Sequence, residues 1–169
     1  KGLENPIVKR LKDRAVPIIA KRREDTVLAL KNEGMEFELV NGGGTGSIET
    51  TIAEDVVTEV TVGSGFYSPH LFDYYSYFQH QPAAGFALEI VRQPTKKRFT
   101  CAGGGYVASG SCDPVRLPAP HLPKKVQLEK NEGVGEVQTP LRYKGNDLNI
   151  GSPVFFRHCK AGELCERFN

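Results

Sequence analysis

Phe37-Glu38-Leu39-Val40-Asn41-Gly42-Gly43-Gly44-Thr45-Gly46-Ser47 is the stretch of sequence that decides the fold. Its first four residues predict a short buried strand, and the glycines that follow predict a turn at the carboxyl end of that strand. Adjacent glycines allow successive backbone N–H groups to converge on an anion, and Thr45 and Ser47 add hydroxyl donors. A phosphate-sized anion site is therefore one interpretation of this loop. A glycine turn that only redirects the chain is the other, with equal support.

The loop does not match the common nucleotide-binding motifs. A Walker loop needs a lysine that is missing here, and Glu49 stands where a dinucleotide-binding loop has its third glycine. A second loop, Gly63-Ser64-Gly65, ends the β-branched run at 56–62. If the strands before the two loops are parallel neighbours, both loops lie at the carboxyl end of a sheet, where α/β barrels bind phosphates. The two loops together then predict one shared phosphate site.

The pattern of apolar residues divides the chain into two parts of different class. The first part predicts a helix, an interruption at Pro17 and a second helix that ends at Gly34. The second part predicts short strands separated by glycine and proline turns, at 86–92, 99–102, 106–108, 125–129, 135–139 and 153–158. We predict an α/β plus β fold. Residues 1–57 form the end of an α/β (TIM-type) barrel, and residues 58–169 form its last strand and an antiparallel β-barrel-like domain.

Two further segments carry candidate residues. Gly103-Gly104-Gly105 follows a predicted strand and indicates a bulge or a close approach of two backbones, with a role in clearing space for a ligand as the alternative. The tail contains His158, Cys159 and Lys160. If the tail is a strand, His158 and Lys160 share one face and Cys159 points to the other. A structural role for the histidine is the simpler explanation.

Composition excludes several classes of function. The chain has 169 residues, 39% of them apolar and 25% charged, with a formal net charge of +2. This charge is too small to predict binding to nucleic acid or to an acidic membrane surface, and no apolar run is long enough to span a bilayer. The four cysteines show no paired short spacing, so we expect them to be reduced, in a cytoplasmic protein. Because the sequence lacks an initiator methionine, we expect a fragment of a longer protein.

Taken in order, the segments resemble the second half of the fold-type III pyridoxal-phosphate enzymes related to D-serine dehydratase and D-threonine aldolase. The amino-acid deaminase branch of that family is the nearest in pattern. The resemblance covers most of residues 38–168, through the stretches Val40–Ser47, Thr58–Asp73, Ala102–Gly110, Glu132–Leu141 and Arg157–Phe168.

The resemblance implies an α/β barrel that carries pyridoxal phosphate, followed by a β domain that closes the active site. It places the family's phosphate-binding residues at Thr45, Gly63 and Ser64, with Gly44 and Gly46 shaping the first loop. It also implies a Schiff-base lysine on an early barrel strand, and no segment of this sequence matches the surroundings of that lysine. We expect the lysine in a missing amino-terminal half of the same protein, and we expect a homodimer.

The resemblance also implies an activity and a set of catalytic groups. The expected protein is a lyase that acts on D-amino acids by dehydration, deamination or aldol cleavage, with His158 and Lys160 near the substrate. Metal-using members bind zinc through a histidine and a cysteine two residues later. His158 fits the first position, but the second is Lys160, whose charged ammonium cannot ligate a metal. An amino-acid racemase, a non-catalytic pyridoxal-phosphate-binding protein and a small β-rich interaction module are the alternatives.

Overall fold

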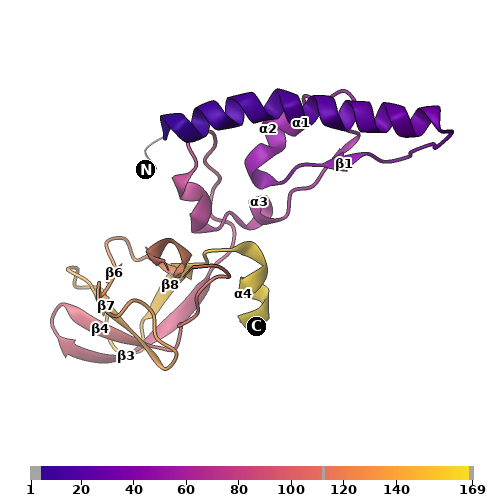
Figure 1. Ribbon diagram of the computed structural model, residues 1–169. Helices are drawn as coiled ribbons and strands as arrows, with labels where there is room; N and C mark the ends of the chain where they lie inside the picture. The colour runs from indigo at the N-terminus through magenta and orange to yellow at the C-terminus, as the bar shows by residue number, and fades with distance from the viewer. Residues whose placement is uncertain (1–4, 112, 168–169) are drawn as a thin grey trace. The chain divides into compact units, whose positions relative to one another are not determined.

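The computed structural model describes residues 5–111 and 113–167, which divide into two compact units (Figure 1). The first unit comprises the chain up to Phe66 together with Tyr75–Phe78. The second comprises Tyr67–Tyr74 and the chain from Gln79 onwards. The chain therefore passes between the two units three times. Residues 58–66 belong to the first unit, and the exchange of residues 67–78 between the units was not predicted.

The first unit begins with one long helix, α1 (Pro6–Asn32). The Asn5 side chain caps it by accepting hydrogen bonds from the backbone of Ile7 (3.0 Å) and Val8 (3.4 Å). At the other end Gly34 has a φ of +85°, and the Gly34 and Met35 N–H groups bond to the carbonyls of Lys31 and Leu30. These two bonds form a Schellman motif, so the predicted glycine stop is confirmed.

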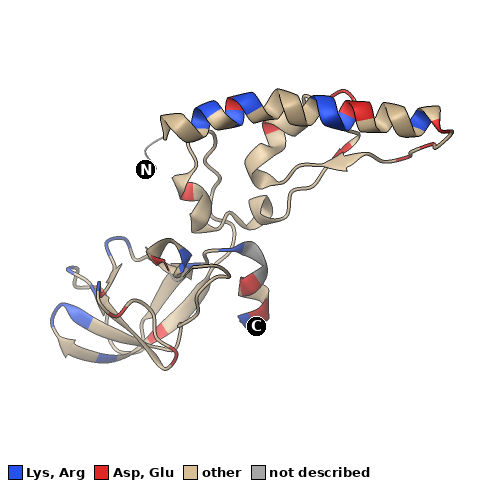
Figure 2. Cartoon of the chain, viewed as in Figure 1, with Lys and Arg blue, Asp and Glu red and all other residues tan. Residues whose placement is uncertain are grey.

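The predicted break at Pro17 is wrong, because α1 continues through it. A proline in the helix interior removes one backbone hydrogen bond and adds a steric cost, but the segments on both sides are long and rich in good helix formers. Lys21 adds surface ion pairs with Glu24 (3.2 Å) and Asp25 (2.9 Å) along the second half. Figure 2 shows Lys and Arg positions at intervals along the ribbon of α1, with Asp and Glu positions among them.

Strands β1 (Asn41–Gly42) and β2 (Glu59–Val60) are parallel neighbours, as predicted, with Asn41 opposite Glu59 and Gly42 opposite Val60. The predicted strand at 37–40 is wrong in its position. Phe37 is 38% exposed and Leu39 is 62% exposed, so this segment is not buried. Within the described residues, no further strand pairs with this two-stranded sheet.

The second unit is built on a six-stranded antiparallel sheet in the order β5-β8-β3-β4-β7-β6. The two outer strands, β5 and β6, also contact each other, so the sheet is nearly closed, as predicted for a barrel-like domain. The strands are β3 (Phe86–Thr95), β4 (Arg98–Ala102), β5 (Ala119–Leu122), β6 (Gln127–Leu128), β7 (Gln138–Arg142) and β8 (Pro153–Arg157).

Alternating burial along these strands produces the hydrophobic core. In β3 the side chains of Phe86, Leu88 and Ile90 point inward, while the residues between them are exposed. Phe86 stacks on Phe156 of β8, with ring centroids 5.4 Å apart. The core consists of Phe86, Leu88, Ile90, Phe99, Cys101, Tyr106, Val126, Leu141, Tyr143, Leu148, Val154, Phe156 and Leu164.

Three predictions about the second unit are corrected. The segment at 106–108 is a loop, although Tyr106 is buried. Strand β5 was missed because prolines obscure it; as an outer strand paired only with β8 it can tolerate them. The tail is not a strand beyond Arg157, because α4 (Ala161–Arg167) begins shortly after it.

Short helical turns complete the fold: η1 (Thr45–Ser47), α2 (Ile48–Thr51), α3 (Ser64–Tyr67), η2 (His70–Tyr74) and η3 (Pro114–Arg116).

Two expectations about the whole chain can be compared with the structure. Cys101, Cys159 and Cys165 are free, as predicted, while Cys112 lies outside the described residues. Within the parts of the chain that the structure describes, none of the helices combines the length and the apolar character needed to cross a bilayer.

The glycine triplet marks a close approach of two backbones, as predicted. A Cβ added to Gly105 would lie 2.1 Å from the carbonyl carbon of Gly135, much closer than any real contact. Gly103 (φ +63°) and Gly104 (φ +96°) also adopt backbone conformations that side chains disfavour. The triplet therefore allows the loop after β4 to lie directly on the loop before β7.

Gly105→Ala should lower the free energy of unfolding of the second unit by more than about 2 kcal/mol, because the added methyl group must displace backbone. Gly44→Ala is the matched control, since a Cβ at that position meets nothing within 4 Å. Urea unfolding of both variants measures the difference. Equal stability of Gly105→Ala and the wild-type chain would contradict the close approach.

Candidate functional site

The two glycine loops lie together at the carboxyl ends of β1 and β2. The Gly65 N–H donates a hydrogen bond of 2.8 Å to the Thr45 hydroxyl oxygen, which joins one loop directly to the other. Before the loops, the Thr61 N–H bonds to the Gly42 carbonyl at 3.1 Å. The predicted juxtaposition of the two loops is therefore confirmed. It follows from the parallel pairing of β1 and β2.

Thr45 is the buried centre of this pair of loops, at 7% exposure. A hydroxyl has one proton to donate and two lone pairs. The Gly65 N–H uses a lone pair, and within the described residues no recorded hydrogen bond uses the Thr45 proton. A buried hydroxyl with a proton to donate suits an anion such as a phosphate oxygen.

The other residues of the loops leave the same region accessible. A Cβ at Gly44 or Gly63 would meet nothing within 4 Å, so space lies beside both backbones. Ser64 is half-buried, and its hydroxyl makes no hydrogen bond within residues 5–111 and 113–167. Gly65 cannot carry a side chain, because a Cβ there would lie 2.6 Å from the Val62 side chain. The loops thus offer hydroxyl donors and open backbone, which fit a phosphate group.

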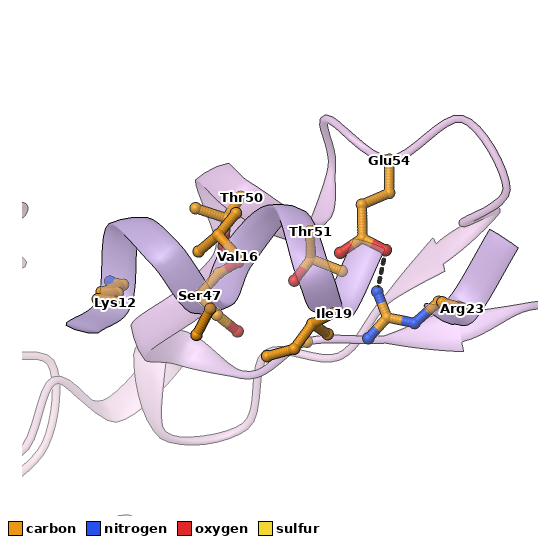
Figure 3. Close-up of a pocket in the computed structure, with 10 residues that line it drawn as sticks. Lys12, Val16, Ile19, Arg23, Ser47, Thr50, Thr51 and Glu54 are labelled. Carbon is orange, nitrogen blue, oxygen red and sulfur yellow. Dashed lines mark hydrogen bonds and ion pairs between the residues drawn. The ribbon is translucent and has the colours of Figure 1, made fainter. Parts of the chain in front are cut away.

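A separate pocket of about 370 Å³ lies between α1 and α2 (Figure 3). Its lining includes Gly43 and Ser47 of the first loop but not Thr45, Gly63 or Ser64. An ion pair between Arg23 and Glu54 closes one end of it, and Lys12 lies at the other. This pocket lies on the α1 side of the first loop.

His158 lies in the second unit, immediately after β8, and is fully buried. Neither of its ring nitrogens makes a hydrogen bond of normal geometry within the described residues. The Tyr67 ring approaches it edge-on, with centroids 6.3 Å apart. Burial lowers the pKa of His158; the nearby Ala84 backbone opposes this, and the charge of Arg157 adds to it. Burial therefore favours the neutral form of the His158 imidazole.

Residues Tyr67–Tyr74 pack around His158, an arrangement that was not predicted from the sequence. Arg157 forms a two-pronged ion pair with Asp73, at 2.6 and 2.9 Å, and also donates to the Ser68 carbonyl at 2.9 Å. The His70 N–H bonds to the His158 carbonyl at 3.1 Å. These contacts span more than 80 residues of sequence, so no local pattern indicates them.

Lys160 does not share a strand face with His158, because the strand ends at Arg157. This corrects the expectation from the sequence. The Lys160 ammonium donates to the Ser109 hydroxyl (2.6 Å) and to the Ser109 carbonyl (3.1 Å). Glu163 accepts a hydrogen bond of 2.6 Å from the Ser109 N–H. Lys160 and Glu163 thus hold the loop that follows the glycine triplet.

The donor set around His158 does not fit a zinc site. In the described ranges, no three His, Cys, Asp or Glu side chains gather as metal ligands would. The neighbouring Cys159 thiol instead donates to the Val115 carbonyl at 2.9 Å, and burial raises its pKa. A thiol held in its protonated form is a poor ligand, since metals bind the thiolate.

The candidate residues therefore form two groups. Gly44, Thr45, Gly46, Gly63 and Ser64 lie together in the first unit, as predicted. His158 and Lys160 lie in the second unit with different surroundings.

Comparison with solved structures identifies a similar fold. A D-threonine aldolase from Filomicrobium marinum superposes with a TM-score of 0.68 over 86% of this chain. The chain is similar in fold to a D-threonine aldolase. The two sequences are 18% identical, and the chain covers 39% of the length of the aldolase. No protein-family model matches the sequence, and no curated protein shows significant similarity to it.

Acidification should destabilise the second unit through its buried histidines. Burial lowers the pKa of both His70 and His158. Below about pH 6.5 the unfolded chain therefore binds more protons at these two residues than the folded chain does. The free energy of unfolding should therefore fall as the pH decreases from about 6.5 towards these lowered values. Urea unfolding between about pH 7.5 and about pH 5 measures this slope. His158→Gln should make it shallower, and an unchanged slope in that variant would contradict the prediction.

Proposed function

We propose that this chain supplies the phosphate-binding end of the barrel and the β domain of a pyridoxal-phosphate-dependent lyase that acts on D-amino acids. The observation that carries the proposal is the hydrogen bond between Gly65 and Thr45, which sets two glycine loops around one buried hydroxyl. The fold shared with a D-threonine aldolase supports it. The whole protein's substrate and reaction are inferred, since this chain corresponds to 39% of that aldolase.

In this proposal the loops bind the phosphate group of the cofactor. The Thr45 hydroxyl oxygen accepts the hydrogen bond from the Gly65 N–H, and the hydroxyl proton is donated to a phosphate oxygen. Ser64 donates its own hydroxyl proton, and Gly44 and Gly63 let the backbone approach closely. When bound, pyridoxal phosphate supplies an electron sink for reactions at the substrate's α-carbon. The chain itself supplies the hold on the phosphate and the orientation that follows from it.

His158 and Lys160 are the residues we assign to the substrate side. A neutral imidazole can accept a proton, and an ammonium can stabilise a developing negative charge. His158 is buried beside Arg157, and Lys160 is already bonded to Ser109, so each would act from a fixed position. No step is assigned to zinc, because the groups around His158 do not fit it. The Schiff-base lysine and a homodimeric assembly, both implied by the resemblance, remain part of the proposal.

Thr45→Val in the intact protein tests the proposed phosphate site. The substitution removes the hydroxyl while preserving the shape of the side chain, so pyridoxal phosphate should bind roughly ten- to a hundred-fold more weakly. Pyridoxal, which lacks the phosphate, should bind equally to both proteins. Thr45→Ser should restore most of the affinity, because it keeps the hydroxyl. Fluorescence or calorimetric titration measures each affinity.

Thr50→Val is the matched control for this experiment. Thr50 lies in α2 of the same unit, and its hydroxyl bonds to the Ser47 carbonyl at 3.0 Å, so it makes no hydrogen bond to Thr45, Ser64 or Gly65. Its loss should leave the affinity for pyridoxal phosphate within about twofold of the wild type. If Thr45→Val and Thr50→Val bind the cofactor equally well, the first loop is a simple turn.

A further inference from the structure

A lysine from α1 reaches the first glycine loop from 34 residues earlier in the sequence. The Lys12 ammonium donates a hydrogen bond of 3.3 Å to the Gly46 carbonyl. It also lies over the Tyr77 ring, 4.2 Å from the centroid. All three residues belong to the first unit. Lys12 is half-buried, so its charge is partly removed from water.

Tyr75 contacts the same glycine. A Cβ built on Gly46 would lie 3.0 Å from a ring carbon of Tyr75, so the aromatic ring lies directly against the loop backbone. Tyr75 in turn packs on Phe78, with ring centroids 5.4 Å apart. The Gly46 peptide is therefore held by an ammonium and by an aromatic ring. The segment Tyr75–Phe78 supplies both aromatic contacts.

The charge of Lys12 is not matched by a carboxylate. Among the residues that the structure describes, no ion pair includes Lys12, and its partners are a neutral carbonyl and an aromatic ring. A carbonyl and an aromatic ring leave the net positive charge of Lys12 in place, so an anion could still be attracted to it. The glycine loop that Lys12 contacts is the loop we assign to a phosphate. The positive charge of Lys12 therefore lies against the backbone of that loop, on the side that faces α1.

We propose that Lys12 is a positioning residue for the anion site, and that it makes the site selective for a doubly charged phosphate ester. The hydrogen bond from the Lys12 ammonium fixes the Gly46 carbonyl. The Ser47 N–H belongs to the same planar peptide group, so it is fixed as well. The Ser47 N–H bonds to the Gly44 carbonyl at 2.9 Å and so closes the turn that presents Thr45. Lys12 need not touch the ligand to act in this way. The selectivity rests on the proposed function, whereas the effect on the turn does not.

Lys12→Met tests both parts. In the intact protein, the affinity for pyridoxal phosphate should fall about tenfold, because the anchor of the turn and the positive charge beside the loop are both lost, while the affinity for pyridoxal should not change. Lys12→Arg should retain most of the affinity, since it keeps a positive charge and donors. Lys31→Met is the matched control, because Lys31 lies in the exposed last turn of the same helix.

A second measurement reports the turn without any ligand. Hydrogen exchange at the Ser47 amide should be faster in Lys12→Met than in Lys31→Met, because the Gly46–Ser47 peptide loses its anchor. Exchange at Ile90, a fully buried β3 residue whose N–H bonds to the Ser152 carbonyl at 3.0 Å, should be unchanged and reports that the rest of the fold is intact.

The outcomes separate this inference from the proposed function. If Thr45→Val weakens cofactor binding but Lys12→Met matches Lys31→Met in both affinity and exchange, the inference is wrong and the proposed function stands. If the intact wild-type protein does not bind pyridoxal phosphate, the proposed function and the selectivity are both wrong. The positioning role is then decided by the exchange of Ser47 alone. Equal losses of pyridoxal and pyridoxal phosphate in Lys12→Met would also overturn the selectivity.

Discussion

The hydrogen bond between the Gly65 N–H and the buried Thr45 hydroxyl is the interaction on which the candidate site depends. Strands β1 and β2 have two residues each, and so short a parallel pair is not stable by its own backbone hydrogen bonds. Contacts beyond the strands must therefore hold the two loops in register. Gly65 makes the close contact possible because it has no side chain, and Thr45 supplies the acceptor.

The second unit is stabilised in a different way. It has a closed hydrophobic core, and the buried Arg157 ties the segment at 67–74 to the sheet through Asp73 and the Ser68 carbonyl. Removing Asp73 would be costly, because the buried guanidinium of Arg157 would remain without its counter-ion, whereas Asp73 itself is 54% exposed. The burial of His158 is a result of this tie. The imidazole is neutral because of where Arg157 places the chain around it.

The sequence predicted the features that follow from local patterns of apolar residues and glycines. Strand-like segments between glycine and proline turns located β3 and β8, and the glycine stop located the end of α1. The parallel pairing expected of the two preceding strands predicted that the two loops meet. Proline caused two wrong predictions. Pro17 was expected to interrupt a helix and does not, and Pro120 and its neighbouring prolines made β5 unrecognisable as a strand. In both cases the surrounding structure, and not local propensity, decided the outcome. The contacts of Lys12 and of Asp73 were not predictable, since each joins residues far apart in sequence and no spacing encodes them.

The interleaving of the chain between its two units bears on how such a protein can be rearranged during evolution. A recombination point after Phe66 would separate the glycine loop from Tyr75, which packs against it. A point after Phe78 would instead separate Asp73 from Arg157. No single junction between these positions leaves both sets of partners together. Exchange of one unit for a foreign one would therefore require matching substitutions on both sides, so the two units are expected to be inherited as a pair.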